Sequence, residues 1–516
     1  MPDAVAYPVP PPGERPHVLL LTEGTYPYAV GGVSTWADLL VRGLAGIDWS
    51  VFAMTAGPVG APALQLPPNA VLAGHLRLWG RNERHRLPGT ARGLDEQPQE
   101  SSGTGVRTGR RQDQPRRRRR PRLAAELARG FVGWSADPLD VVPALVWCRE
   151  NPDDVVPTFR EAATWERYIR ALARILAEEH EEVGETPSLD LGRAIELYGT
   201  LSWVARAAAA PTPRADVSLL TAAGWCTIPA AVDKAIRGTP VLLAEHGIYV
   251  REAYLSAVRS SDSPAAQLVR TRLSRGLSRL AYRVADVVAP VTAAHRPWEE
   301  FLGADPESIV TIPNGVPAPS DPPPPPRHFR VASVGRIDPL KDLPTMLRVA
   351  DRVVRRVPQA TFLHYGPVPQ GQEAYAKGCH QLHSRLGLGP SFRFMGPTPD
   401  PIGAVRDADV LLMTSISEGF PMSVLEALSQ SRPVVTTLVG GVLDAMRGAG
   451  ITAPPGDVDG LADGVTTLLL DHELAETLGR RGHDRVRRLF DPSRCLDPYR
   501  ALLHAMATAT EETAQE

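Results

Sequence analysis

The chain alternates short apolar runs with longer stretches in which apolar residues recur at helical spacing. Its first apolar run, residues 17–22, has the composition of a buried parallel strand. A glycine-containing loop follows, and beyond Ser34 a helix is predicted whose apolar face holds Trp36, Leu39, Leu40 and Leu44. A strand, a glycine-rich loop and a helix in this order form the opening unit of a doubly wound α/β domain.

The same alternation continues in two series. The first predicts helices at 157–182 and 191–209, and strands at 217–221, 241–245, 287–291 and 309–312. The second predicts strands at 330–334, 361–365, 392–395, 410–414 and 434–437. Five consecutive prolines at 322–326 separate the series, and such a run adopts extended polyproline II because it continues neither a helix nor a central strand. We therefore expect an α/β protein with two Rossmann-like, doubly wound domains that face each other across a cleft.

These patterns set the expected domain boundaries. The N-terminal domain is expected at 1–318, the Pro-rich linker at 319–327, the C-terminal domain at 328–490, and a C-terminal helix packing back on the N-terminal domain at 491–516. Residues from about 81 to 122 interrupt the first domain with Gly, Ser, Gln and 13 Arg against 5 acidic residues. Few of these could enter a core, so a disordered insertion is predicted.

Composition narrows the class of protein. A chain of 516 residues is too long for one ordinary core, and a net charge of −2 gives no general argument for nucleic-acid binding. The four cysteines lie far apart without a metal-binding spacing and are expected to be buried free thiols. No run approaches the roughly 20 apolar residues of a membrane span. The first 16 residues also lack the apolar core of a signal peptide, so a cytoplasmic location is expected.

Residues 417–427 carry the most informative chemistry. Glu418 follows the predicted strand at 410–414, and Glu426 lies eight residues later, near the start of a helix that Pro421 would open. Ligands of open α/β sheets bind at this carboxyl end of the strands. Because one carboxylate can accept hydrogen bonds from two neighbouring hydroxyls, the two acids indicate a polyhydroxyl ligand such as a sugar.

A second pair of charged residues follows the first strand of the C-terminal series. Arg336 and Lys341 come directly after Gly335, and a guanidinium fork beside an ammonium group suits a diphosphate. Lys341 is one of only three lysines against 53 arginines, so a lysine here runs against the bias of the chain. The alternative is a solvated loop with two ordinary surface charges.

Two features of the first domain are weaker signals. Gly31 and Gly32 offer backbone amides that an anion can approach closely, although most such pairs are plain turns. His246 follows the predicted strand at 241–245, although a lone histidine is more often structural than catalytic.

Taken in order, Gly31-Gly32, His246, Arg336 with Lys341, and the Glu418/Glu426 pair resemble the signature of glycosyltransferase family 4, the retaining transferases of GT-B fold. A narrower resemblance, to the PelF-like branch of bacterial exopolysaccharide synthesis, rests on residues 23–36, 245–249 and 414–419. The chain differs from the family pattern at two places. The Glu-Arg pair usual after 246–249 is only partly kept, as Arg251-Glu252 followed by Ala253, and a histidine expected near the start of 218–225 is absent.

The resemblance implies a role for each residue. Arg336 and Lys341 would neutralise the diphosphate of the donor, and Glu426 would accept hydrogen bonds from the nucleotide ribose. Glu418 and the backbone amides after Gly419 would hold the transferred sugar, with Gly419, Phe420 and Pro421 as donor-binding residues. His246 would contact that sugar from the opposite domain, and Gly31-Gly32 would lie against the phosphates beside Gly335.

The physical chemistry agrees with these roles. Departure of a nucleoside diphosphate leaves negative charge on the phosphate, so preorganised cations stabilise the transition state more than the ground state. With Arg336 and Lys341 in this role, no metal or other cofactor is expected. The acidic residues of 153–154 and 457–459 are interpreted as helix starts.

The function expected from the resemblance is retaining transfer of a hexose from a nucleotide sugar, with UDP-glucose as the donor, to a glycan or exopolysaccharide acceptor. Two alternatives are a non-catalytic nucleotide-sugar-binding subunit of a membrane polysaccharide complex and a glycosyl phosphorylase on the same fold. Donor hydrolysis by the isolated protein would distinguish the enzyme from the binding subunit. A requirement for phosphate would identify the phosphorylase.

The run of five arginines from Arg116 to Arg120 has three interpretations. It could be a solvated disordered loop, an attachment to anionic lipid or inner-membrane synthesis proteins, or a nucleic-acid contact. The third is disfavoured, because no aromatic residues are interleaved with the arginines.

Overall fold

The computed structural model of the chain describes residues 15–24, 26–29, 31–57, 60–78, 120–133, 136–183, 190–259, 264–369 and 371–515. Apart from residues 120–122, the predicted insertion lies outside this described part of the chain, as does the arginine run apart from Arg120.

The N-terminal half folds around a six-stranded parallel sheet in the order β3-β2-β1-β4-β5-β6. Its central strand β1 pairs with β2 on one side and β4 on the other, with Leu20 opposite Val51 and Leu219. The strands are β1 (His17–Glu23), β2 (Asp48–Thr55), β3 (Ala70–Arg77), β4 (Val217–Leu220), β5 (Val241–Glu245) and β6 (Val287–Pro290).

The C-terminal half folds around a second six-stranded parallel sheet, in the order β12-β11-β10-β7-β8-β9. The strands are β7 (Arg330–Val334), β8 (Thr361–Tyr365), β9 (Phe392–Gly396), β10 (Val410–Met413), β11 (Val434–Thr437) and β12 (Gly450–Ala453). In both sheets the first strand of the series is central and the strand order reverses beside it, which is the doubly wound arrangement.

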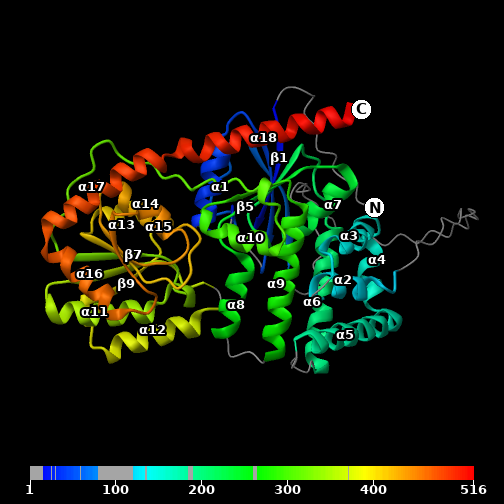
Figure 1. The fold of residues 1–516 in the computed structure, drawn as a ribbon, viewed down its shortest axis with the longest axis horizontal. Helices are drawn as coiled ribbons and strands as arrows, with labels where there is room; N and C mark the ends of the chain where they lie inside the picture. Colours follow the sequence, from blue (N-terminus) through cyan, green and yellow to red (C-terminus); the bar gives the residue numbers. More distant parts are fainter. Residues whose placement is uncertain are drawn as a thin grey trace, which may run out of the picture.

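Helices connect the strands and cover both sheets (Figure 1). The N-terminal half contains α1 (Gly32–Gly43), α2 (Leu123–Val132), η1 (Pro138–Val141), α3 (Val142–Glu150), α4 (Pro152–Phe159), α5 (Ala162–Val183), α6 (Leu191–Ala209), α7 (Thr227–Arg237), α8 (Tyr249–Arg259), α9 (Pro264–Val284), η2 (Ala293–His295), α10 (Arg296–Leu302) and η3 (Pro306–Ser308). The remainder contains η4 (Pro339–Lys341), α11 (Leu343–Arg356), α12 (Glu373–Arg385), η5 (Gly389–Ser391), α13 (Pro401–Arg406), α14 (Met422–Ser429), α15 (Val442–Met446), α16 (Val458–Leu470), α17 (His472–Leu489) and α18 (Pro492–Gln515).

Two predicted elements differ from the structure. The helix predicted at 157–182 is largely α5, which begins at Ala162, whereas residues 157–159 form the end of α4, where the Phe159 carbonyl accepts a hydrogen bond from the Tyr198 hydroxyl. The strand predicted at 309–312 is only an extended segment along the edge of β6, with an isolated pairing of Val288 and Ile309. Strands β2, β3 and β12 were not predicted.

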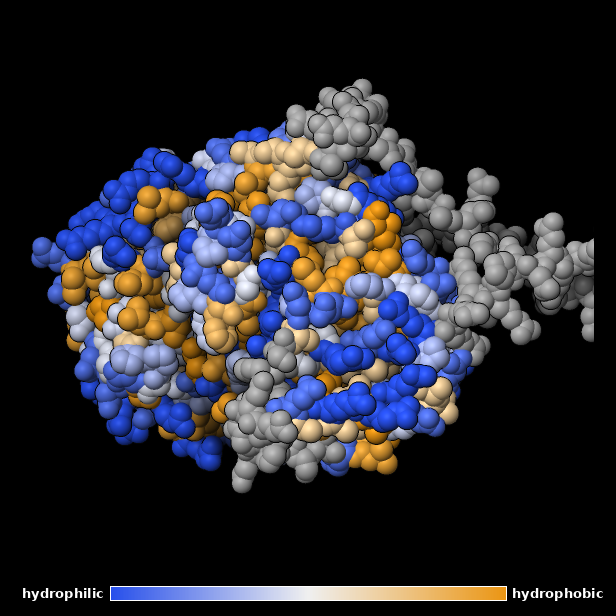
Figure 2. All heavy atoms as spheres, turned by 45° about the vertical axis from the view of Figure 1, so that its right-hand side comes forward, coloured by the Kyte–Doolittle hydropathy of each residue, from blue (hydrophilic) through white to orange (hydrophobic). Residues whose placement is uncertain are grey.

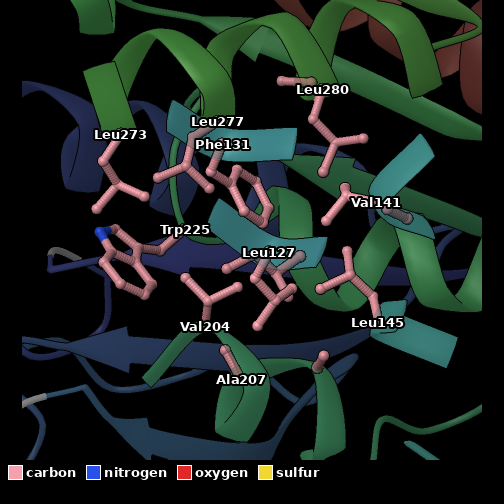
Figure 3. Packing of buried hydrophobic residues seen from close by; sticks show 14 of the residues in the cluster. Leu127, Phe131, Val141, Leu145, Val204, Ala207, Trp225, Leu273, Leu277 and Leu280 are labelled. Carbon is pink, nitrogen blue, oxygen red and sulfur yellow. The ribbon is translucent and has the colours of Figure 1, made fainter. Parts of the chain in front are cut away.

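The N-terminal domain has a helical layer between β3 and β4 with an apolar core of its own. Leucine, valine and phenylalanine side chains from α2, α3, α6 and α9 point toward one another and toward the sheet (Figure 3). Leu127, Phe131, Leu145 and Leu277 are at most 1% exposed. The layer stabilises the edge of the sheet formed by β2 and β3 through its contact with Phe52 and Leu76.

The Pro-rich segment that connects the domains is fixed to the C-terminal domain. The guanidinium of Arg432, which is 1% exposed, donates to the carbonyl oxygens of Pro323 (2.8 Å), Pro324 (3.3 Å) and Arg406. The carboxylate of Asp409 accepts hydrogen bonds from the backbone amides of Arg327, His328 and Arg330. These contacts hold both ends of the proline run against one domain.

The helix α18 returns to the N-terminal domain. It leaves the C-terminal domain beside α17 and runs across the top of the first sheet in Figure 1. Cys495, Tyr499 and Leu503 of α18 are buried in one apolar cluster with Trp36 and Leu40 of α1. All four cysteines are buried and free, as predicted.

Candidate active site

The Lys341 ammonium and the Glu418 carboxylate form an ion pair at the carboxyl end of the second sheet. Nζ of Lys341 lies 2.5 Å from Oε1 of Glu418, and the two residues are 77 positions apart. Lys341 ends the η4 turn after β7, and Glu418 lies on the loop between β10 and α14. The pair forms because β7 and β10 are adjacent parallel strands, so that their following loops meet at one edge.

The backbone around Lys341 is held in place from both sides. The Asp338 carboxylate accepts from the Leu340 amide, and the Thr414 hydroxyl donates to the Lys341 carbonyl at 3.0 Å. Asp342, at a φ of 46°, caps α11 through Thr345. The side chain therefore projects from a rigid turn.

Arg336 lies on the loop that follows β7, directly after Gly335. Its guanidinium is 3.2 Å from Asp338 Oδ2, and its side chain is 59% exposed. It is thus an accessible cation at the same sheet edge as Lys341. A Cβ on Gly335 would stand 3.6 Å from Cε of Lys341.

Glu426 lies on the first turns of α14 and is only 9% exposed. Among the described residues, none donates a hydrogen bond or forms an ion pair with its carboxylate. Burial raises the pKa of Glu426 to about 7. A buried carboxyl group without a protein partner costs free energy, and this cost is relieved where a ligand supplies hydroxyl donors.

The two domains touch at Gly419. A Cβ atom on this residue would stand 1.6 Å from the His246 carbonyl oxygen and 3.3 Å from Gly247 Cα, so only glycine fits. Behind it, the Gly441 amide donates to the Gly419 carbonyl at 2.7 Å. The contact brings the loop of Glu418 directly against the end of β5.

His246 follows β5 and packs on Trp36 of α1, with ring centroids 4.3 Å apart. Its Nε2 atom is buried and has no hydrogen-bond partner within the part of the chain that the structure describes. Burial, reinforced by the neighbouring His295, lowers the pKa of His246 to about 3. The ring is therefore neutral at pH 7 and suited to hydrogen bonding rather than to proton donation.

The remaining predicted residues surround this centre. Gly31 and Gly32 begin α1, and a Cβ on Gly32 would lie 3.5 Å from Met422 Cγ at the start of α14. Pro421 precedes the same helix. The Phe420 side chain is buried against Phe490, with centroids 5.3 Å apart.

Sequence reasoning missed several polar residues on the N-terminal side. Arg251 Nη2 donates to Ser417 Oγ at 2.5 Å, and the Thr292 hydroxyl donates to Asp444 at 2.6 Å, both across the domain boundary. The buried carboxyl groups of Glu245 and Glu299 lie close enough to interact, and burial raises the pKa of both. Arg251 was noted in the sequence only as a departure from the family pattern, and its contact with Ser417 was not predicted.

No cluster of metal-binding side chains occurs among the described residues. Asp153 and Asp154 lie in the first turn of α4, and Asp457 caps α16, so the prediction that these acids start helices is confirmed. None of the described helices is long and apolar enough to cross a membrane.

Residues 16–307, more than half of the chain, match the family described as "Domain of unknown function (DUF3492)". The chain belongs to the DUF3492 family. Beyond the DUF3492 region, residues 328–471 match the family described as "Glycosyl transferases group 1". Arg336, Lys341, Glu418 and Glu426 all lie within this second match.

Curated relatives match only part of the chain. A D-inositol 3-phosphate glycosyltransferase of Kribbella flavida is 34% identical over 159 residues, which are 29% of this chain and 37% of the relative. One from Nocardia farcinica is 28% identical over 258 residues, covering 44% and 50%. A trehalose synthase of Thermococcus litoralis is 26% identical over 184 residues, covering 34% and 44%. The chain thus spans half or less of the length of these relatives.

Two solved structures cover nearly the whole chain. Sucrose-phosphate synthase of Thermosynechococcus elongatus has a TM-score of 0.57 at 18% identity, covering 95% of this chain and 100% of that one. Anabaena HepE in complex with UDP and glucose has a TM-score of 0.56 at 16% identity, covering 94% and 99%. Identity at this level shows the fold, which is GT-B, and the predicted fold class is confirmed.

Proposed function

We propose that this protein is a retaining hexosyltransferase that moves glucose from UDP-glucose to a glycan or exopolysaccharide acceptor. The observation that carries the proposal is the Lys341–Glu418 pair, 2.5 Å long, at a sheet edge where Glu426 offers a buried carboxyl group without a protein partner. The glycosyl transferases group 1 match over these residues supports it, as does HepE, which has been solved with UDP and glucose.

The Lys341–Glu418 pair suggests how the donor engages the site. Lys341 and Glu418 are 25% and 11% exposed, so the pair is reachable yet shielded. A diphosphate competes with Glu418 for the ammonium group, and Arg336 gives it a second cation. Glu418 is then released to accept hydrogen bonds from the hydroxyls of the sugar.

The same arrangement suits the chemistry of transfer. As the bond between the sugar carbon and the phosphate oxygen breaks, negative charge grows on the phosphate that Arg336 and Lys341 face. The new bond forms from an acceptor hydroxyl, and the proton of that hydroxyl leaves with the departing phosphate. Glu426 would hold the ribose, and the neutral His246 would hold a sugar hydroxyl from the N-terminal domain.

The finer parts of the proposal follow the sequence resemblance. They are membership of glycosyltransferase family 4 and its PelF-like branch, transfer without a divalent metal, and work in the cytoplasm or at the inner membrane. Because two cations already face the expected diphosphate position, EDTA should leave UDP release unchanged, and a loss of activity that Mg²⁺ restores would refute this part.

The test is UDP release from UDP-glucose by the isolated protein, with and without glycan acceptors. Lys341→Ala and Glu418→Ala should each slow release by about 100-fold or more, while thermal unfolding stays cooperative. The matched control is Lys377→Ala, an exposed lysine of α12. Unchanged turnover in both site variants would refute the assignment. A wild-type protein that binds UDP-glucose but releases no UDP with any acceptor would be a binding subunit.

A further inference from the structure

Glu252 lies on the first turn of α8, in the N-terminal domain, and its carboxylate turns back toward the end of β5. A Cβ on Gly247 would stand 2.6 Å from Glu252 Oε1, so the carboxylate lies directly over Gly247. Gly247 itself is the residue that, with His246, contacts Gly419 of the C-terminal domain. The carboxylate of Glu252 therefore lies next to the point where the two domains meet.

A neighbouring contact fixes this part of α8 against the loop of Glu418. Arg251, adjacent to Glu252, donates to Ser417 Oγ at 2.5 Å. The charged groups near the Glu252 carboxylate are accordingly Arg336, Glu418, Arg251 and Lys341, three of which belong to the C-terminal domain. These three are the charged residues expected around the diphosphate and the sugar.

Glu252 has the properties of a group that is available to a ligand. The residue is exposed to solvent, although nearby protein atoms partly desolvate its carboxylate. Within the described part of the chain, no hydrogen bond or ion pair occupies its carboxylate. This desolvation raises the pKa of Glu252, and the positive charge of Arg336 opposes the rise. A purely structural glutamate at a domain boundary would be expected to pair with one of the nearby cations.

We infer that Glu252 is a third carboxylate of the reaction centre, which accepts a hydrogen bond from a hydroxyl of the donor sugar on the side opposite Glu418. The inference rests on the proposed function. Bound diphosphate occupies Arg336 and Lys341, and this leaves Glu418 and Glu252 to the uncharged part of the donor. Since the two carboxylates belong to different domains, the sugar is held on both sides only while the domains touch.

The test compares UDP with UDP-glucose as ligands of the full-length protein, by calorimetry. Glu252→Gln removes a negative charge from beside Arg336 and Lys341, so UDP should bind equally well or more tightly. UDP-glucose should bind about tenfold more weakly, the loss expected for a charge-assisted hydrogen bond. Release of UDP from UDP-glucose should slow in parallel. Only UDP-glucose is thus expected to bind more weakly, a difference between the two ligands that a general loss of structure does not produce.

Ser256→Ala is the matched control, because Ser256 is exposed on α8 one turn beyond Glu252, and neither affinity should change. A wild-type ratio of the two affinities in Glu252→Gln would overturn the inference, as would an equal weakening of both ligands. Failure of the wild-type protein to bind either ligand overturns the proposed function instead, and the inference with it.

Discussion

At the scale of single residues, the proposed contact of Glu426 with the nucleotide would link UDP binding to pH. Burial raises the pKa of this carboxyl to about 7, so the free protein loses the ionised form as the pH falls through 7. In the proposed function the ribose hydroxyls donate to the ionised form, so that binding would compete with protonation. We predict that UDP affinity, measured by calorimetry, falls by up to about tenfold per pH unit below 7 from this group alone.

The phosphates of UDP also titrate in this range, so the contribution of Glu426 is obtained by comparing the pH profiles of the wild type and of Glu426→Gln. Glu426→Gln should bind UDP about tenfold more weakly at pH 8 and should show a shallower pH dependence, because only the ligand still titrates. Parallel pH profiles for the variant and the wild type would contradict the assignment of Glu426 to the ribose.

Residue by residue, the sequence could place the C-terminal groups better than the N-terminal ones. Lys341 and Glu418 each follow a predicted strand, and the ends of parallel strands meet at one edge, so their proximity was predictable. Glu252 lies six residues after His246, on a helix, and its importance depends on how two separately folded domains meet. Hydrophobic periodicity carries no information on that contact.

At the scale of elements, the loop between β10 and α14 is shaped to touch the other domain. Gly419→Ala would place a Cβ against the backbone of His246, which cannot move aside as a flexible side chain could. We predict that the variant keeps UDP binding within a few-fold. UDP release should slow by about 100-fold, because the groups of the two domains are held apart.

The control for this change is Gly378→Ala on α12, where a Cβ meets no atom within 4 Å. Replacing a helical glycine in open space should stabilise the protein by about 0.4–1 kcal/mol and leave UDP release unchanged. Equal activities of the two alanine variants would show that the domains need not touch at Gly419.

The Pro-rich segment gives a second prediction at this scale. Arg432→Ala removes the buried donor to the carbonyls of Pro323, Pro324 and Arg406 and leaves them unpaired. We expect a loss of about 3–5 kcal/mol in the unfolding free energy of the C-terminal domain, measured with urea. Arg385→Ala, at an exposed position of α12, should change it by less than about 0.5 kcal/mol.

The elements themselves were predictable where apolar residues are continuous. The runs at 241–245 and 330–334 are strands with those bounds, because both faces of a central parallel strand are buried. Strands β2 and β3 were not predicted, since Ser50 and Gly74 interrupt them. The run at 309–312 is apolar but makes only an isolated pairing beside β6. Pairing of this kind depends on neighbours that are distant in the sequence.

At the scale of the whole molecule, polar and apolar residues are interspersed over the face drawn in Figure 2. The two domains are connected by α18 as well as by the Pro-rich segment and the contact at Gly419. Tyr499 of α18 packs on Trp36 with ring centroids 5.5 Å apart, and Trp36 in turn packs on His246. The helix therefore supports a residue of the candidate site through one intervening ring.

We predict that Tyr499→Ala destabilises the N-terminal domain by about 3–5 kcal/mol, as measured by urea unfolding, and slows UDP release through the loosened His246. Tyr499→Phe is the matched control, because the buried hydroxyl has no hydrogen-bond partner among the described residues. It should be neutral or slightly stabilising. Equal stability of Tyr499→Ala and the wild type would show that α18 does not support His246 through Trp36.

The position of α18 also has a consequence for synthesis on the ribosome. The apolar face of α1, which includes Trp36 and Leu40, is translated early, but its covering residues Tyr499 and Leu503 are translated after the whole C-terminal domain. At a translation rate of about 5–20 residues per second, the apolar face of α1 is made tens of seconds before the residues of α18 that cover it. The N-terminal domain thus begins to be made before the C-terminal domain but is completed after it, and the apolar face of α1 lacks its α18 cover until then.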